Sequence, residues 1–210
     1  MSANSRIVRM GLRASEAGAA AVELALVFPL LLMFTFAIIE FGLVLHQMNM
    51  AEKATQLGVR KAVTWDPVAT ELATFTPTGG GLGAGDPLPV GLQVDVVCDN
   101  AGCTGAGAIA SPTFSSVAFN AIVDAMADIY PGIGPEDVVI EYHNIGLGFV
   151  GKPGGSVVPT VTVRLRNLTY DFVLLDVAVS IVSFGAVDIN DIIYPSFSAT
   201  LTGEDLSDGA

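Results

Sequence analysis

The chain has 210 residues, 51% of them hydrophobic, and a formal net charge of −12 at pH 7. This length gives room for one membrane helix and one modest globular domain, so we expect no second domain. Residues 62–210 hold seventeen acidic side chains against three basic ones, which excludes nucleic acid as a partner because nothing there could neutralise a phosphate backbone.

The chain begins with a short basic leader, residues 1–17, which carries Arg6, Arg9 and Arg13. Such a leader also begins an ordinary secretory signal, and it can precede an uncut membrane anchor. The apolar run that follows is too long for a secretory signal, and no small-residue cleavage site followed by a turn appears near Leu45.

An apolar segment follows over residues 18–45. It carries no charge from residue 24 to residue 39 and resumes after Glu40, which makes it long enough to cross about 30 Å of hydrocarbon. Glu23 lies inside this segment, where an ionised side chain costs on the order of 3 kcal/mol and usually has a partner. A cut after Gly18 would give Ala19 an α-amine that could pair with Glu23 and set the axial register between helices.

A glycine with a glutamate five residues later, at the head of an apolar helix, resembles the class III signal of type IV pilin-like proteins. Residues 16–63 more specifically resemble TadE-like proteins, the minor pseudopilins of the Flp (tight adherence) pilus. In one place the chain departs from that pattern, because Leu24 follows Glu23 where an aromatic residue is common. The matching elements are Gly18, residues 19–21, Val22, Glu23, Pro29, the triplet Glu40, Phe41 and Gly42, and the small-residue helix through Ala54, Gly58 and Arg60.

This resemblance implies a minor pilin or pseudopilin that a prepilin peptidase processes between Gly18 and Ala19. The protein would cross the bacterial inner membrane once and could also enter an extracellular pilus. Its partners would be other pilin-like subunits, bound through the amino-terminal helix, and the proteins of the pilus assembly platform. Glu23 would guide register during assembly.

Charge alone does not settle the orientation of the membrane segment. Three arginines precede it, and Lys53, Arg60 and Lys61 follow within the distance over which the positive-inside rule operates. The acidic remainder and the paired cysteines favour a cytoplasmic amino terminus and a periplasmic head. The alternative function is a single-pass, membrane-anchored envelope domain with a binding or enzymatic role, in which Gly18 and Glu23 have no special part.

Helical spacing continues past the apolar segment, which predicts one membrane helix with an amphipathic extension over residues 19–65. Asp66 and Pro67 would end it. The small residues Ala54 and Gly58 would permit close approach of a neighbour. Glu40 would lie at the membrane interface or meet a basic residue of a neighbouring subunit. We therefore take Glu40, Ala54 and Gly58 as candidate interface residues.

Proline and glycine punctuate residues 66–90, which we interpret as a flexible connection or an exposed loop. Residues 91–203 then form an extracytoplasmic head. We expect strands over 92–96, 138–143, 160–166 and 195–202 and a helix over 111–130 whose N-cap is Ser111. Residues 172–184 are apolar enough to be buried, but their periodicity does not separate strand from helix. The predicted fold class is α+β, pilin-like, with an antiparallel sheet, and the acidic tail 204–210 is expected to be disordered.

The chain has two cysteines, Cys98 and Cys103. In an exported domain such a pair most often forms a disulfide that closes a small loop. Free thiols and a metal site are the alternatives. A metal site would lack ligands, because the only histidines are His46 and His143. Asp188, Asn190 and Asp191 could be drawn as calcium ligands but lack the EF-hand pattern. No nucleophile elbow, metal-binding helix or dinucleotide fingerprint is present, so we predict no catalysis, no cofactor and no metal.

Overall fold

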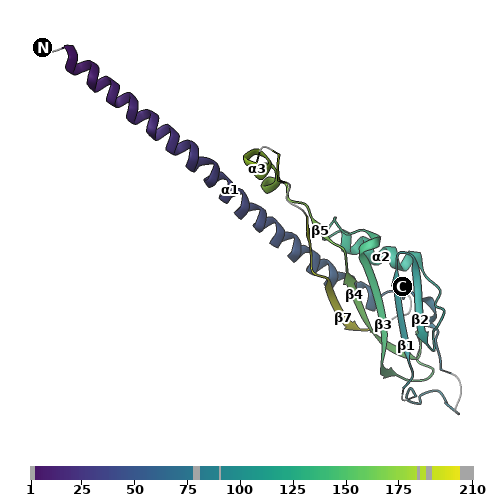
Figure 1. Ribbon diagram of the computed structural model, residues 1–210. Coiled ribbons are helices and arrows are strands. Elements are labelled where there is room, and N and C mark those ends of the chain that lie inside the picture. The colour runs from purple at the N-terminus through teal and green to yellow at the C-terminus, as the bar shows by residue number, and fades with distance from the viewer. Residues whose placement is uncertain (1–2, 78–80, 90, 184, 188–190, 204–210) are drawn as a thin grey trace. The chain divides into compact units, whose positions relative to one another are not determined.

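A computed structural model describes residues 3–77, 81–89, 91–183, 185–187 and 191–203 (Figure 1). It forms two compact units, which are described separately below. The first unit comprises Met1–Leu45 and Tyr170–Ile192, and the second comprises His46–Thr169 and Ile193–Ala210. The tail 204–210 and two of the three calcium candidates, residues 188 and 190, lie outside the described residues.

The longest element is α1, Ala3–Val63, a helix of 61 residues. The predicted membrane helix and its extension are thus one continuous helix, which ends three residues before Asp66. The helix also takes in most of the basic leader. Its alanine, arginine, leucine and methionine residues favour the helical state. Pro29 lies inside the helix and does not end it.

The first unit contains α1 as far as Leu45 and a second helix, α3, Leu174–Val182. The structure therefore makes the undecided stretch 172–184 mainly helical. Two short strands, β5 (Thr169–Tyr170) and β6 (Ile192–Ile193), pair with each other on either side of α3 in the sequence.

The second unit is built on a five-stranded antiparallel sheet with the order β2-β1-β3-β4-β7. This arrangement confirms the predicted α+β class. The expected strands appear, with their ends shifted by a few residues, and Gly102–Gly107 is an additional strand that the sequence did not predict. The strand bounds are β1 Val94–Asp99, β2 Gly102–Gly107, β3 Val138–Gly148, β4 Val157–Leu165 and β7 Phe197–Thr202.

Alternate side chains of the central strands are buried, so one face of the sheet meets the core and the other meets solvent. On β4 the buried side chains are Val157, Pro159, Val161, Val163 and Leu165. The core is completed by α2, Ser116–Ala127, and by the last part of α1. These two helices approach closely at Gly58, where an added Cβ would lie 2.5 Å from the Sδ atom of Met126.

Two local expectations differ from the structure. The N-cap of α2 is Ser115, whose side chain accepts a hydrogen bond from the N–H of Ala118, and not Ser111. The helix starts later because the residues before it pair with another segment. Phe114 forms a β-bridge with Ala69, and the Ser115 N–H donates a hydrogen bond to the Val68 carbonyl.

The first part of the segment 66–90 is also packed rather than exposed. Val68, Ala69 and Leu72 are fully buried, and Thr70–Ala73 forms a short 3₁₀ helix. Among the described residues of this segment the structure has no α-helix and no strand of the sheets, as the prolines and glycines predicted. They carry no information on whether its few apolar side chains reach the core.

Candidate functional site

The amino-terminal part of α1 presents apolar side chains all round its surface. The stretch from Gly18 to Val63 is long and apolar enough to cross a membrane, and its most apolar 18-residue window is 0% buried within the chain. Such a surface needs lipid or other helices around it. The helix is therefore compatible with a single-pass membrane anchor. Its exposed residues include Leu24, Leu26, Val27, Phe28, Leu30, Phe34, Ile38, Phe41 and Leu45.

The predicted processing residues lie at the start of this surface. Gly18, Ala19 and Glu23 are all exposed, and an added Cβ at Gly18 would meet no atom within 4 Å. Ala19 and Glu23 are four residues apart, so they lie on the same side of the helix one turn from each other. The Glu23 carboxylate is thus open to a partner outside the chain.

Glu40, the second acid of the apolar run, is in a different environment. Its side chain is only 1% exposed, although its neighbours Ile39 and Phe41 are 50% and 64% exposed. Oε1 accepts hydrogen bonds from the Tyr170 hydroxyl at 2.7 Å and from the Val173 N–H at 3.0 Å. Oε2 accepts from the N–H groups of Leu174 at 2.7 Å and Leu175 at 3.0 Å.

The three backbone donors belong to the first turn of α3, whose N–H groups have no partner within their own helix. Val173 occupies the N-cap position and supplies no side-chain hydrogen bond. Glu40, more than 130 residues earlier in the chain, takes the place of the usual Ser, Thr, Asp or Asn cap. The negative charge also faces the positive end of the α3 dipole, which adds a favourable electrostatic contribution.

The covered face of α1 follows helical spacing. Phe36 and Ala37 are half-buried, and Glu40 and Val44 are buried, while the residues between them are exposed. Positions three to four residues apart lie on one side of a helix. A narrow strip of α1 is therefore covered within the first unit, and the rest of its surface stays apolar and open.

For Glu40 this geometry replaces the expected basic partner of a neighbouring subunit, while the expected position at the membrane interface stays a prediction. We expected this carboxylate at the membrane interface or against a basic residue of a neighbour, and the structure satisfies it within its own chain. Ala54 and Gly58 are likewise buried in the second unit rather than open to a neighbour. Sequence reasoning missed the partners of Glu40. The acid inside an apolar run was a visible signal, but residues 172–184 did not reveal in the sequence that a helix begins there.

A family model described as TadE-like protein matches residues 18–60. Residues 18–60 are similar to this family. The match agrees with the resemblance found in the sequence, covers α1 from Gly18 almost to its end, and includes both Glu23 and Glu40. It indicates a component associated with the Tad pilus, from a structural family not known for enzymatic activity. No curated protein and no solved structure matches the chain.

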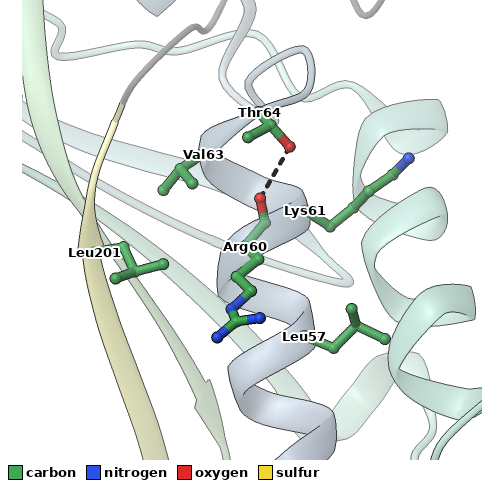
Figure 2. A pocket seen from close by; sticks show the side chains of 6 residues that line it. All are labelled: Leu57, Arg60, Lys61, Val63, Thr64 and Leu201. Carbon is green, nitrogen blue, oxygen red and sulfur yellow. Dashed lines mark hydrogen bonds between the residues drawn. The ribbon is translucent and has the colours of Figure 1, made fainter.

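The carboxyl-terminal end of the TadE-like segment lines a cleft against the edge strand β7. Its lining comprises Leu57, Arg60, Lys61, Val63 and Thr64 at the end of α1 and Leu201 of that strand, and Figure 2 shows Val63 and Leu201 on one side of the helix and Leu57 and Lys61 on the other. The cleft has a volume of about 470 Å³, and Thr64 at its end donates a hydrogen bond from Oγ1 to the Arg60 carbonyl at 2.9 Å. Its lining contains two cations but no acid or thiol, so it offers no acid–base pair for catalysis.

Gln47 of the TadE-like segment connects the helix to two loops of the head. Its Oε1 accepts hydrogen bonds from the hydroxyls of Tyr130 at 3.1 Å and Tyr194 at 3.3 Å. Burial, with a further contribution from nearby Tyr130, raises the pKa of Tyr194 to about 12. Both phenols therefore stay protonated at neutral pH and serve as donors.

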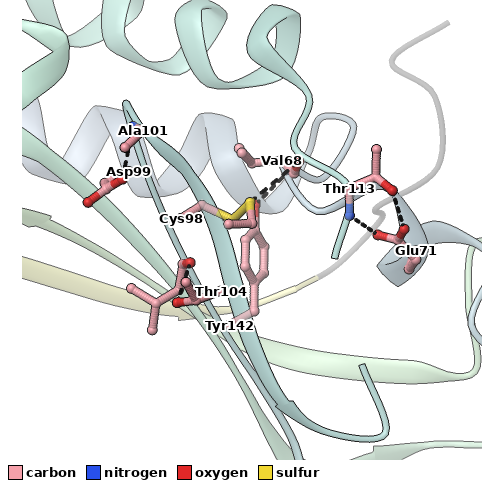
Figure 3. Close-up of a disulfide and its surroundings, with 10 residues drawn as sticks. Val68, Glu71, Cys98, Asp99, Ala101, Thr104, Thr113 and Tyr142 are labelled. Atoms are coloured by element: carbon pink, nitrogen blue, oxygen red, sulfur yellow. Dashed lines mark hydrogen bonds between the residues drawn. A yellow bond between two sulfur atoms is a disulfide. The ribbon is translucent and has the colours of Figure 1, made fainter. Parts of the chain in front are cut away.

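Cys98 and Cys103 face each other across the β1–β2 hairpin and form a disulfide (Figure 3). The connected strand β2, GCTGAG, has little side chain to bury, and the bond ties it to the central sheet. Close by, the Val68 N–H donates to the buried hydroxyl of Tyr142 at 3.1 Å, and burial raises the pKa of that phenol. This part of the head is a structural support rather than a reactive thiol site.

The solvent face of the sheet carries a short line of charged groups. Asp95 accepts a hydrogen bond from His143 Nδ1 at 2.8 Å, and Arg164 donates to Glu141 at 3.0 Å. The hydrogen bonds from His143 and Gln93 lower the pKa of Asp95. Within the described residues no group of three or more His, Cys, Asp and Glu side chains could hold a metal ion.

Proposed function

We propose that this protein is a minor pilin or pseudopilin, a structural and assembly component of a Flp (tight adherence) pilus. The observation that carries this proposal is the TadE-like match over residues 18–60. The exposed apolar surface of α1 supports it, because a helix that its own chain leaves uncovered is suited to packing among other helices or lipid. The head would project from the membrane and contribute contacts rather than catalysis.

In this proposal a prepilin peptidase cuts between Gly18 and Ala19 on the cytoplasmic side of the inner membrane. The exposure of both residues supports access to this bond. The new Ala19 amine then pairs with the exposed carboxylate of Glu23 in the same or a neighbouring chain. Because charge pairing in apolar surroundings is directional, this contact would set the register of one pilin-like helix against another. The other partners would be the proteins of the assembly platform, and the subunit could also enter the extracellular filament.

The two acids of the membrane segment would then have different functions. Glu40 is satisfied within the chain, so it has no carboxylate oxygen free for a neighbouring subunit. Glu23 is exposed, and it is the acid that remains available for assembly. This division supports Glu23 rather than Glu40 as the register residue.

The decisive experiment is mass spectrometry of the amino terminus of the native protein from cells with and without prepilin peptidase. We expect a start at Ala19 only when the peptidase is present, and a block of processing in Gly18→Leu. Gly42→Leu is a matched control, since Gly42 lies on the same helix and an added Cβ there also meets no atom within 4 Å. An intact leader on the native protein would contradict the proposal and would favour an anchored envelope domain.

The function of Glu23 can be tested separately. Glu23→Gln removes an intramembrane charge, so insertion should be as efficient as in the wild type or more so, while co-purification with pilin-like partners should fall. Glu52→Gln changes an exposed acid on the second-unit part of α1 and should leave partner binding intact. Wild-type yields of partner with Glu23→Gln would show that this carboxylate does not set register.

A further inference from the structure

Helix α3 has an exposed apolar side. Val173 and Val177 are 63% and 55% exposed, and their spacing of four residues places them on the same face. On the other side Ala178 is 8% exposed, so α3 is covered there. The only charged residue of α3 is Asp176. A helix with this composition and an open valine face is poorly suited to water.

The hydrogen bonds of Glu40 fix where α3 begins relative to the apolar part of α1, since both belong to the first unit. Glu40 lies before the end of the apolar run, and Phe41 and Leu45 beyond it are 64% and 44% exposed. At 1.5 Å per residue, Glu40 is about 24 Å along the helix from Leu24 and about 7.5 Å before Leu45. A bilayer that covers the exposed apolar residues of α1 must therefore also reach the start of α3.

We propose that α3 is an interfacial membrane helix whose Val173 and Val177 face inserts among the acyl chains of the head-side leaflet. Helices of this kind place their apolar face about 5–10 Å into the boundary between headgroups and acyl chains, and the start of α3 lies within that range. Asp176, three residues after Val173, and Ser180, three residues after Val177, lie beside the two valines at the edge of this face, where their polar groups can remain near the headgroups.

Glu40 has a structural function in this arrangement. Its carboxylate is at a depth where water is scarce, and so are the three N–H groups at the start of α3. Each group satisfies the other, so neither meets hydrocarbon with an unpaired polar atom. The inference rests on the membrane anchor and not on the pilus function, and it assigns the lipid of the head-side leaflet as the surface that covers α3.

The test uses single-cysteine variants of the full chain, reconstituted at low density into phosphatidylcholine and phosphatidylglycerol vesicles and labelled with a polarity-sensitive fluorophore. The native cysteines are joined to each other and are not labelled without reductant. Val177→Cys tests α3, Ile38→Cys is the lipid-facing control on α1, and Val117→Cys is the water-facing control on α2. Ile38 and Val117 are 72% and 78% exposed within the chain.

We expect the Val177→Cys label to show blue-shifted emission, quenching by brominated acyl chains and protection from aqueous iodide, as at Ile38→Cys. Labelling at Val117→Cys should give the opposite pattern. Iodide quenching at Val177→Cys with lipid quenching at Ile38→Cys would overturn the inference and leave the anchor intact. Protection of Val177→Cys from both quenchers would indicate cover by a second copy and would also overturn it. Absence of lipid quenching at Ile38→Cys would remove the anchor and the inference together. None of these outcomes depends on processing at Gly18, so failure here is distinguishable from failure of the pilus function.

Discussion

The hydrogen bonds to Glu40 predict that α3 is released when this carboxylate becomes an amide. In Glu40→Gln one of the two oxygens becomes an NH₂ group. If that group replaces Oε2, it faces the N–H groups of Leu174 and Leu175, and if it replaces Oε1, it faces the N–H of Val173. In either orientation at least one buried backbone donor loses its acceptor, and the remaining bonds lose their charge.

A hydrogen bond to a charged group contributes about 1.5–3 kcal/mol. One such loss should therefore raise the population of the undocked state by about tenfold to about 150-fold. Because water cannot replace the missing acceptor in a membrane, this range is a minimum. Hydrogen exchange of the amides of residues 173–175, measured in lipid nanodiscs, reports the change directly, since these three N–H groups are the ones bonded to Glu40.

The control for this experiment is Glu52→Gln, which removes an exposed acid from the same helix and should leave exchange at residues 173–175 unchanged. Processing and membrane insertion should survive in both variants, because neither residue lies at the cleavage motif. Wild-type exchange rates in Glu40→Gln would refute the argument that this side chain caps α3.

Two further predictions concern the second unit and can be followed by denaturation monitored at its tryptophan, Trp65. Gly58→Val should lower the melting temperature, because an added Cβ would lie 2.5 Å from Met126 Sδ. Such overpacking costs about 1–3 kcal/mol, and each kcal/mol lowers the melting temperature of a domain of this size by about 2–4 °C. Gln56→Val on the exposed side is the control, and an unchanged or higher melting temperature for Gly58→Val would contradict the close packing. Burial acts to raise the pKa of Glu71, but hydrogen bonds from the Thr113 N–H and hydroxyl outweigh it and lower the pKa below its ordinary value of 4.5. The stability from this contact is therefore full above pH 4.5 and is lost as the pH falls through the lower pKa of the folded state. Glu71→Gln should be less stable than wild type at pH 7, and urea titrations should show that difference shrinking as the pH falls below 4.5; a constant difference would rule out Glu71 as its source.

Local patterns in the sequence predicted most of the head correctly. The alternation of Val161, Val163 and Leu165 with polar residues predicted β4, and the strand exposes and buries its residues in that order. The strand β2 was missed because Gly102–Gly107 has no apolar alternation. It exists because backbone pairing with β1 and the bond between Cys98 and Cys103 hold it at the edge of the sheet.

The structure of residues 172–184 could not be read locally either. Only Asp176, Ser180 and Ser183 interrupt their run of apolar residues, so neither a period of two nor one of 3.6 stands out. The helix α3 is selected by a contact with Glu40, which supplies the capping oxygens that Val173 lacks. The local pattern of residues 172–184 gives no information on a hydrogen-bond acceptor that lies more than 130 residues away in the sequence.

The sequence by itself determined the membrane-length helix, its TadE-like motif, the α+β class and the two acids that interrupt the apolar run. Those features depend on composition and on spacing along one helix or strand. Only the tertiary structure decided that Glu40 is satisfied within the chain while Glu23 stays exposed. The physical reason is that both acids have apolar neighbours in sequence, and only the folding of a distant segment onto the strip of α1 around Glu40 brings four donors to one of them.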